Sequence, residues 1–368
     1  MRASLTSSAA PSASCNLVAI ATYFFLSIGY NKGVKRRKEN KPMKKLLALT
    51  LVLIFVLIPL AGCAKDTTAV RLGGMTGPTS IGMAKLLADD KAGTAKNDYE
   101  FTLVGSGADM KAKLLSGDVD IAAIPANLAA TLYNATKGEI QVIAVNTLGV
   151  VSLLETGNTV NSLADLKGKT VYAPASAKGA IPEIVFSYLL STANLTLGED
   201  VTVEWLPTAA GGANPLAPKL KTGEIVLSPE PAASALLSNV EGARRAIVLD
   251  DAWDALDNGC EYVTGVTVVR RAFAEEHPQV VKRFLDEYED SIEYANENAA
   301  DTAAKVVEFG ILDLKAALIE KAIPSCHIDF EDGNDMKAEL KAYYELLVSV
   351  NAAAFGGKAP DDGFYYVK

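Results

Sequence analysis

Cysteine and histidine are scarce in this chain of 368 residues, which has four cysteines and two histidines. No Cys-x-x-Cys spacing occurs, and two histidines are too few for a typical cluster of His and Cys ligands around a metal. We therefore expect no metal site and no cofactor. Cys260 and Cys326 are the only cysteines past the leader, and the sequence is equally consistent with a disulfide between them and with two free thiols.

Catalytic motifs are lacking as well. The sequence has no Gly-x-Ser-x-Gly nucleophile elbow and no Gly-Lys-Ser phosphate loop. His277 precedes a proline and His327 follows Cys326, and neither has an evident catalytic partner. We therefore expect no catalytic residues, and an enzyme is the main alternative hypothesis only because α/β folds also host catalysts.

Positive charge is sparse outside the first 62 residues. The whole chain has a net charge of -9, but residues 1–62 hold nine Lys and Arg against one acidic residue, Glu39. The remaining 26 basic and 43 acidic residues give the rest of the chain a net charge near -17. A body of this charge repels nucleic acid and anionic lipid, so we expect neither as a direct ligand.

The leader has the architecture of an export signal. Met43 is followed by two lysines, by an apolar run over residues 46–60 and by Leu60-Ala61-Gly62-Cys63. The last four residues resemble the lipobox of bacterial lipoproteins, which implies acylation of Cys63 as the first residue of the mature chain. A transmembrane segment that ends in cysteine is the alternative, but the run is short and contains Pro59. The signal predicts that residues 1–42 are an artefactual extension, 43–62 a lipoprotein signal peptide and 63–68 a tether.

The body alternates strand-like and helix-like segments, which predicts an α/β fold. A first cycle runs from residue 70 to 154, and a second opens near residue 162. A shift of 106 residues aligns 113–125 with 219–231, and each segment has a helix end, a glycine, an acidic residue, an apolar strand and a proline. After a strand over 263–269 the pattern is mostly helical. We expect two lobes, 69–160 plus 265–368 and 161–264, with the tail packed on the first.

Three motifs carry a resemblance to a known family. They are Gly77-Pro78-Thr79-Ser80, the segment Gly117–Pro125 and Leu163–Lys169. This ordered set resembles the substrate-binding proteins of bacterial ABC importers, in the group for nitrate, sulfonates, taurine and thiamine precursors. The resemblance implies a type II periplasmic-binding-protein fold, in which two lobes joined by two crossing strands close around one solute. It also implies a monomer outside the cytoplasmic membrane that serves an ABC permease and ATPase.

Loops at the carboxyl ends of the strands are the predicted ligand site, because ligands of open α/β sheets bind there. Helix N-termini at these loops favour an anion or a carbonyl oxygen. For each residue singly, capping or turn formation is the competing role. The candidates are polar residues of these loops: Thr76, Thr79, Ser80, Ser106, Asp109, Asn127, Thr147, Ser176, Lys178, Glu230 and Thr264.

Two other functions stay open at this point. One is an enzyme on the same fold, for example in thiamine-precursor metabolism. The other is a lipoprotein that binds a solute only to present it to a sensor. The sequence identifies neither the solute nor its charge.

Overall fold

The computed structural model describes residues 66–207 and 214–367. These residues belong to one unit that begins at Asp66. None of the helices in the two described stretches is long and apolar enough to cross a membrane. The predicted signal peptide and Cys63 lie outside the described residues.

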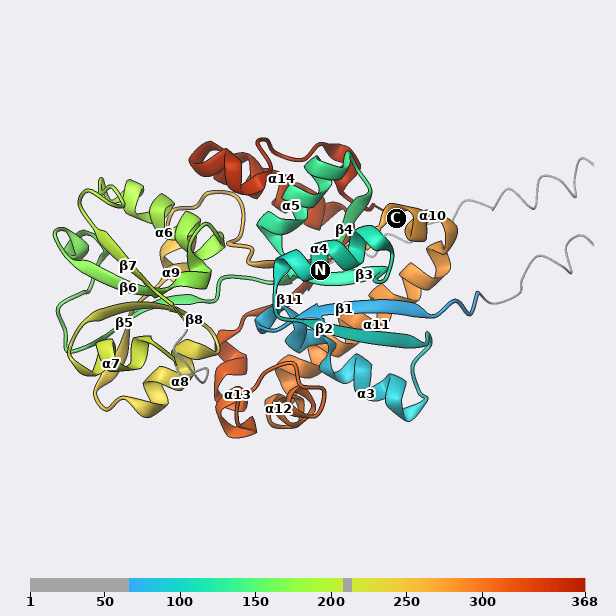
Figure 1. Cartoon of the computed structure of the whole chain (residues 1–368), viewed down its shortest axis with the longest axis horizontal. Helices are drawn as coiled ribbons and strands as arrows, with labels where there is room; N and C mark the ends of the chain where they lie inside the picture. Colours follow the sequence, from blue (N-terminus) through green and yellow to red (C-terminus); the bar gives the residue numbers. More distant parts are fainter. Residues whose placement is uncertain (1–65, 208–213, 368) are drawn as a thin grey trace, which may run out of the picture. The chain divides into compact units, whose positions relative to one another are not determined.

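The first sheet has six strands in the order β11-β4-β10-β3-β1-β2 (Figure 1). β1 pairs in parallel with β2 and β3, whereas β10 is antiparallel to β3 and β4, and β11 is antiparallel to β4. The strands are β1 Val70–Met75, β2 Tyr99–Val104, β3 Ile121–Pro125, β4 Ile140–Thr147, β10 Gly265–Arg270 and β11 Ile328–Glu331.

The helices that accompany the first sheet come from two stretches of chain, one before residue 137 and one after residue 270. Gly117 ends one of them in the left-handed conformation, with φ of 79°, which glycine adopts without strain. The elements are η1 Pro78–Met83, α3 Ala84–Ala92, α4 Gly107–Ser116, α5 Ala126–Thr136, α10 Arg271–Glu276, α11 Pro278–Glu297, α12 Ala299–Glu308, α13 Ala316–Ala322, η5 Ile323–Ser325, α14 Gly333–Asn351, η6 Ala352–Phe355 and η7 Asp362–Phe364.

The second sheet has five strands in the order β7-β6-β8-β5-β9. β6 is parallel to β7 and β8, and β5 is antiparallel to β8 and β9. Gly223, which the predicted repeat aligns with Gly117, also has positive φ, at 89°. The elements are β5 Val151–Thr156, η2 Leu163–Leu166, β6 Thr170–Pro174, η3 Ala175–Ala177, α6 Ile181–Thr192, β7 Thr202–Leu206, α7 Leu216–Lys221, β8 Ile225–Pro229, α8 Ala232–Asn239, β9 Ala243–Val248 and α9 Leu249–Asp254.

The chain passes between the two sheets at two short connections. β4 leads to β5 through residues 148–150, and α9 leads back to β10 through residues 255–264. The chain after β10, called the tail below, also contacts helices that accompany the second sheet: α13 packs against α8, and α14 packs against α6. Two strands were not predicted from the sequence: β9, and β11, which adds an edge strand to the first sheet.

An aromatic cluster fills the region where the second connection meets α14. Trp253 is buried, and its ring lies 5.8 Å from that of Tyr262 and 6.0 Å from that of Tyr343. The Tyr343 hydroxyl donates to the Val263 carbonyl at 2.5 Å, and the Tyr344 hydroxyl donates to the Ala126 carbonyl at 2.9 Å. This core includes buried residues of both sheets, so α14 holds the second connection and the start of α5 in place.

Candidate functional site between the two sheets

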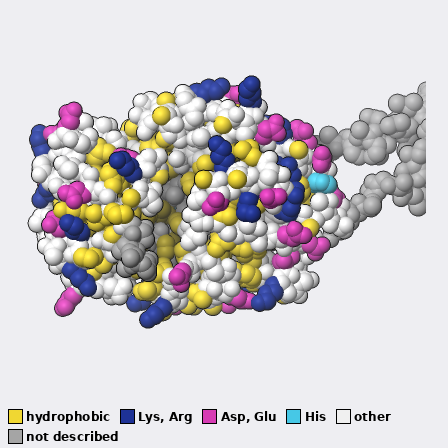
Figure 2. Space-filling model, viewed as in Figure 1, with side chains coloured by type: hydrophobic (Ala, Val, Ile, Leu, Met, Phe, Trp, Pro, Cys, Tyr) yellow, Lys and Arg dark blue, Asp and Glu magenta, His cyan; other side chains and the backbone are white. Residues whose placement is uncertain are grey.

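A cavity of about 270 Å³ lies where the first connection, the second sheet and the tail meet. On the face seen in Figure 2, the surface is hollowed between the parts that carry the two sheets, and hydrophobic side chains line part of the hollow. The walls of the cavity come from three stretches of chain that are distant in sequence. The first stretch, the connection and β5, gives Gly149, Val150, Val151 and Ser152. The second, from the end of β8 through β9 to α9, gives Glu230, Arg245, Val248 and Asp251, and the tail gives Ser325 and His327.

An ion pair between Glu230 and Arg245 forms one wall of this cavity. Arg245 Nη2 lies 2.5 Å from Glu230 Oε1, and the Glu230 side chain is 1% exposed against 29% for Arg245. Glu230 Oε2 accepts the backbone N–H of Ser234 at 3.1 Å. Arg245 Nη2 also donates to Ser325 Oγ at 3.3 Å, so this guanidinium joins the second sheet to the tail.

His327 and Asp250 make a second contact between the tail and the second sheet. His327 Nδ1 lies 2.6 Å from Asp250 Oδ2, and this hydrogen bond raises the pKa of His327 above its ordinary value, against the opposing effect of burial. The backbone N–H of Leu148 donates to the His327 carbonyl at 2.9 Å. A Cβ at Gly149 would lie 2.1 Å from Asp250 Oδ1, so only glycine lets the carboxylate approach the connection this closely.

Three of the predicted ligand residues meet around Gly265, at the start of β10. A Cβ on Gly265 would lie 2.5 Å from Thr79 Cγ2 and 3.3 Å from Thr147 Cβ. The backbone N–H of Thr264 donates to the Thr147 carbonyl at 2.9 Å, and the Thr264 carbonyl accepts from Ala126 at 3.0 Å. The Thr147 hydroxyl is buried and donates to Asn146 Oδ1 at 2.9 Å.

Three other predicted residues are occupied by local hydrogen bonds. The Ser80 hydroxyl is buried, accepts the N–H of Met75 at 2.9 Å and donates to its carbonyl at 2.8 Å. Ser106 caps α4 by accepting the N–H of Asp109, and its hydroxyl donates to the Asp109 carboxylate at 2.7 Å. These side chains fix the turn after β1 and the start of α4, the competing roles considered from the sequence.

The remaining predicted residues lie apart from the cavity walls. Thr76, Ser176 and Lys178 are exposed and Asn127 is partly buried. Within residues 66–207 and 214–367, none of these four side chains has a hydrogen-bond partner. Of the eleven predicted residues, Glu230 alone lines the cavity; Arg245, Asp251 and His327 were not predicted.

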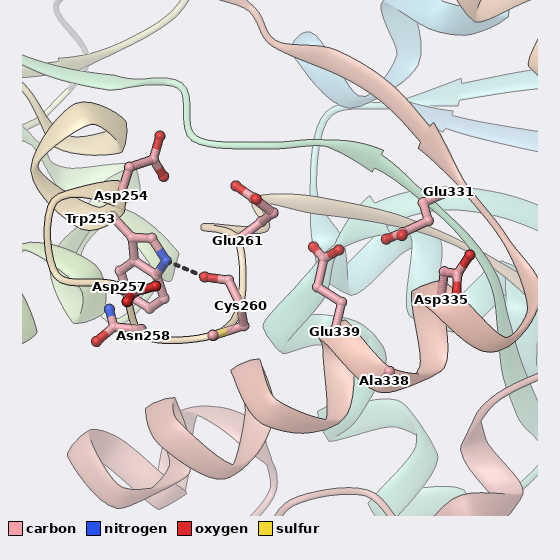
Figure 3. A pocket seen from close by; sticks show the side chains of 11 residues that line it. Trp253, Asp254, Asp257, Asn258, Cys260, Glu261, Glu331, Asp335, Ala338 and Glu339 are labelled. Atoms are coloured by element: carbon pink, nitrogen blue, oxygen red, sulfur yellow. Dashed lines mark hydrogen bonds between the residues drawn. The ribbon is translucent and has the colours of Figure 1, made fainter. Parts of the chain in front are cut away.

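A second pocket, of about 480 Å³, lies between the segment after α9 and α14 (Figure 3). Its lining has six carboxylates and no Lys or Arg: Asp254, Asp257, Glu261, Glu331, Asp335 and Glu339. The carboxylate of Glu339 lies between those of Glu261 and Glu331. Burial, with the hydrogen bond and the charge of Glu331, raises the pKa of Glu339 to about 9. Closely spaced carboxylates repel an anion, so this pocket is a weaker candidate than the cavity of about 270 Å³ for binding an anionic solute.

The structure decides between the two alternatives for the cysteines past the leader. Cys260 and Cys326 are both free thiols, Cys326 fully buried. Burial raises the pKa of Cys260 to about 11, so its thiol stays protonated at neutral pH. In the part of the chain that the structure describes, no group of three or more His, Cys, Asp or Glu side chains is arranged to hold a metal ion.

Comparison with known proteins agrees with this arrangement of two sheets. The family model described as "NMT1/THI5 like" matches residues 140–302. An ABC transporter structure from Parabacteroides distasonis has a TM-score of 0.65 at 23% identity, over 82% of this chain and 99% of the other. The periplasmic aliphatic sulphonate binding protein SsuA from Escherichia coli has a TM-score of 0.60 at 16% identity, over 80% of this chain and 92% of the other. The body has the periplasmic binding protein fold. 

The alkanesulfonate-binding protein SsuA from Xanthomonas axonopodis pv. citri, solved with MOPS, shares this periplasmic binding protein fold. Its TM-score is 0.57 at 15% identity, over 79% of this chain and 99% of the other. The predicted fold class is thereby confirmed, and the family model and these structures bear out the resemblance stated from the sequence. No curated protein sequence matches the chain.

Proposed function

We propose that this chain is an extracytoplasmic solute-binding protein that captures one small polar solute and delivers it to an ABC-type importer. The observation that carries the proposal is the cavity between the two sheets, whose walls include the Glu230–Arg245 pair and the His327 side chain. The names of the Escherichia coli and Xanthomonas structures, both sulfonate-binding proteins, support a polar ligand.

The size of the cavity supports a small solute. At about 30 Å³ for each water of the bulk liquid, 270 Å³ corresponds to roughly nine waters, less than the pockets that hold drug-sized ligands. The cavity walls belong to both the second sheet and the tail, so a bound solute contacts both. A ligand that contacts both walls favours the closed arrangement over the open one by the free energy of those shared contacts.

We assign binding of the solute to Glu230 and Arg245, which line the cavity. The predicted residues Thr79, Thr147 and Thr264 lie around Gly265 and are not among its walls.

The closing units of the proposal are the two lobes, one built on each sheet. Their boundary lies at residues 148–150 rather than at the predicted residue 160, because β5 (Val151–Thr156) pairs with β8 and β9 of the second sheet. Acylated Cys63 anchors the protein to the membrane, and the protein acts as a monomer with its permease and ATPase. No catalytic residue is proposed, so the solute is released unchanged.

A thermal-shift screen tests this function. The protein extracted from membranes is heated with sulfonates, nitrate, amino acids and pyrimidines in turn. A solute at one hundred times its dissociation constant stabilises the folded state by about 2.7 kcal/mol, so a binding solute raises the midpoint of unfolding. The same solute should shift the Arg245→Met variant less. A flat response across the panel, or chemical conversion of the solute, would contradict the proposal.

A further inference from the structure

The chain entering β1 is held on the first sheet's helices by Asp66. Its carboxylate accepts the N–H of Thr68 at 3.0 Å and lies 2.8 Å from Nδ1 of His277, the residue that precedes α11. Its carbonyl accepts from Arg283 Nη2 at 2.5 Å. We call Asp66 with His277 and Arg283 the Asp66 clamp.

The clamp is attached to buried groups rather than to mobile surface side chains. Arg283 Nε donates to Asn97 Oδ1 at 2.7 Å, and the Asn97 amide donates to the Val280 carbonyl at 3.1 Å. Asn97 is 5% exposed. Hydrogen bonds from His277 and Thr68 lower the pKa of Asp66 to about 2, so the carboxylate is charged throughout the physiological range.

The clamp shortens the tether that the sequence predicts. Cys63 precedes Asp66 by three residues and the start of β1 by seven. At up to about 3.6 Å per extended residue, three residues reach about 11 Å and seven reach about 25 Å. Asp66 therefore reduces the reach of the anchor by more than half.

From this geometry we infer that the Asp66 clamp keeps the corner of α10 and α11 against the lipid surface. The inference rests on the proposed acylation of Cys63. The exposed residues of the corner include Glu275 and Glu276, and Lys282 is paired with Asp286 at 2.6 Å. This corner has no excess of basic side chains that would attract anionic lipid, so the short anchor, rather than surface charge, sets the orientation.

The orientation has a consequence for closing. The start of β1 and α10 lie at one end of the body and the second sheet lies at the other (Figure 1). A tether that holds the first end near the membrane therefore keeps the second sheet, which carries the other closing unit of the proposal, at the far end from the lipid.

Fluorescence quenching at a vesicle surface tests the inference. The whole acylated protein, in a Cys260→Ser background, is reconstituted in phosphatidylcholine vesicles with a nitroxide on the lipid headgroup. A fluorophore is attached to Gln279→Cys, in the first turn of α11, or to Glu241→Cys, between α8 and β9; both native residues are exposed. We expect at least about threefold stronger quenching at position 279, since the reach of the tether is about 11 Å.

A matched variant separates tether length from folding. Twelve Gly and Ser residues inserted between Lys65 and Asp66 leave the clamp intact and give a tether with an r.m.s. length of roughly 20 Å. Quenching at 279 should fall toward that at 241, with no change in the midpoint of thermal unfolding. The variant Asp66→Ala with His277→Ala should lose part of the difference.

Membrane fractionation of wild type and Cys63→Ala is run in parallel. If wild type is not retained through Cys63, the proposed anchor is wrong and the inference falls with it. If wild type is retained but positions 279 and 241 are quenched equally, the anchor stands and the inference is wrong. Quenching that survives the insertion unchanged also overturns it.

Discussion

The Glu230–Arg245 pair offers a direct test of the cavity through the substitution Glu230→Gln. Glutamine keeps the shape of the side chain and can still accept the N–H of Ser234, so the change removes one charge. Arg245 Nη2 then faces an amide oxygen instead of a carboxylate at 2.5 Å. The loss of stability therefore reports the charge pairing rather than packing.

The expected cost follows from the burial of the two partners. Breaking a fully buried ion pair costs about 3–5 kcal/mol. Here Glu230 is 1% exposed, but Arg245 is 29% exposed and keeps its hydrogen bonds to Ser234 and Ser325. We expect a loss of about 2 kcal/mol, since hydrogen bonds to charged groups contribute about 1.5–3 kcal/mol. At an unfolding entropy of about 2.1 cal/mol/K per residue, over a body of about 300 residues, the midpoint falls by roughly 3 °C.

The neighbouring residue of β9 supplies a matched control. Arg244 pairs with Glu155 at 2.5 Å, with side-chain exposures of 33% and 2%, and neither residue lines the cavity. Glu155→Gln should lose similar stability while binding the screened solute with wild-type affinity, whereas Glu230→Gln should weaken binding as well. The assay is thermal unfolding with a double-mutant cycle to Arg245→Met. A change below about 0.5 kcal/mol with no coupling to Arg245 would refute the reasoning.

Three further substitutions test other parts of the structure. Glu339→Gln should stabilise the protein at pH 9 by more than about 1.4 kcal/mol and leave its stability unchanged at pH 4. The reason is that the raised pKa of Glu339 makes the stability of the wild type fall between pH 4.5 and about 9. Equal pH profiles of the two proteins in thermal unfolding would argue against the raised pKa. Asp120→Asn should cost about 3 kcal/mol at pH 7. Burial disfavours the charge of Asp120, but hydrogen bonds from Arg71 and Arg270 outweigh it and lower the pKa of Asp120. The contribution of these ion pairs to stability is therefore present above pH 3.8 and lost below it. No change in urea unfolding at pH 7 would count against this cluster. Gly149→Ala should destabilise the protein by at least about 1 kcal/mol, because the added Cβ meets the Asp250 carboxylate. Gly105→Ala is the control and should cost little, because there is open space at its Cβ. Equal unfolding midpoints for the two variants would contradict the close approach of Asp250 to Gly149.

Local patterns were sufficient for most elements of the fold. The repeat that aligns 113–125 with 219–231 predicted a helix end, a glycine and a strand in each segment. The structure has α4, Gly117 and β3 in the first and α7, Gly223 and β8 in the second, and both glycines have positive φ. β9 was missed because Arg244 and Arg245 interrupt its apolar pattern. These two arginines are accommodated in a strand because they pair with Glu155 and Glu230, and those carboxylates lie beside them only in the folded sheet.

The site was predictable only in part, for a related reason. Glu230 was found because it follows a strand and stands between two prolines, which is a local signal. Arg245 and His327 reach the cavity from an unpredicted strand and from the tail, so their roles depend on contacts across 15 and 77 residues of chain. For Ser80 and Ser106 the sequence showed a polar residue at a helix start but did not distinguish capping from ligand contact.

The central claim is that one solute binds reversibly to this fold without chemical change. Calorimetric titration of the purified protein with the solute found by thermal shift tests it most directly, with the solute recovered afterwards and identified by mass spectrometry. The account predicts one solute per chain, weaker binding by Glu230→Gln but not by Glu155→Gln, and recovery of the solute intact. A converted solute, or equal affinity for the two variants, would contradict it.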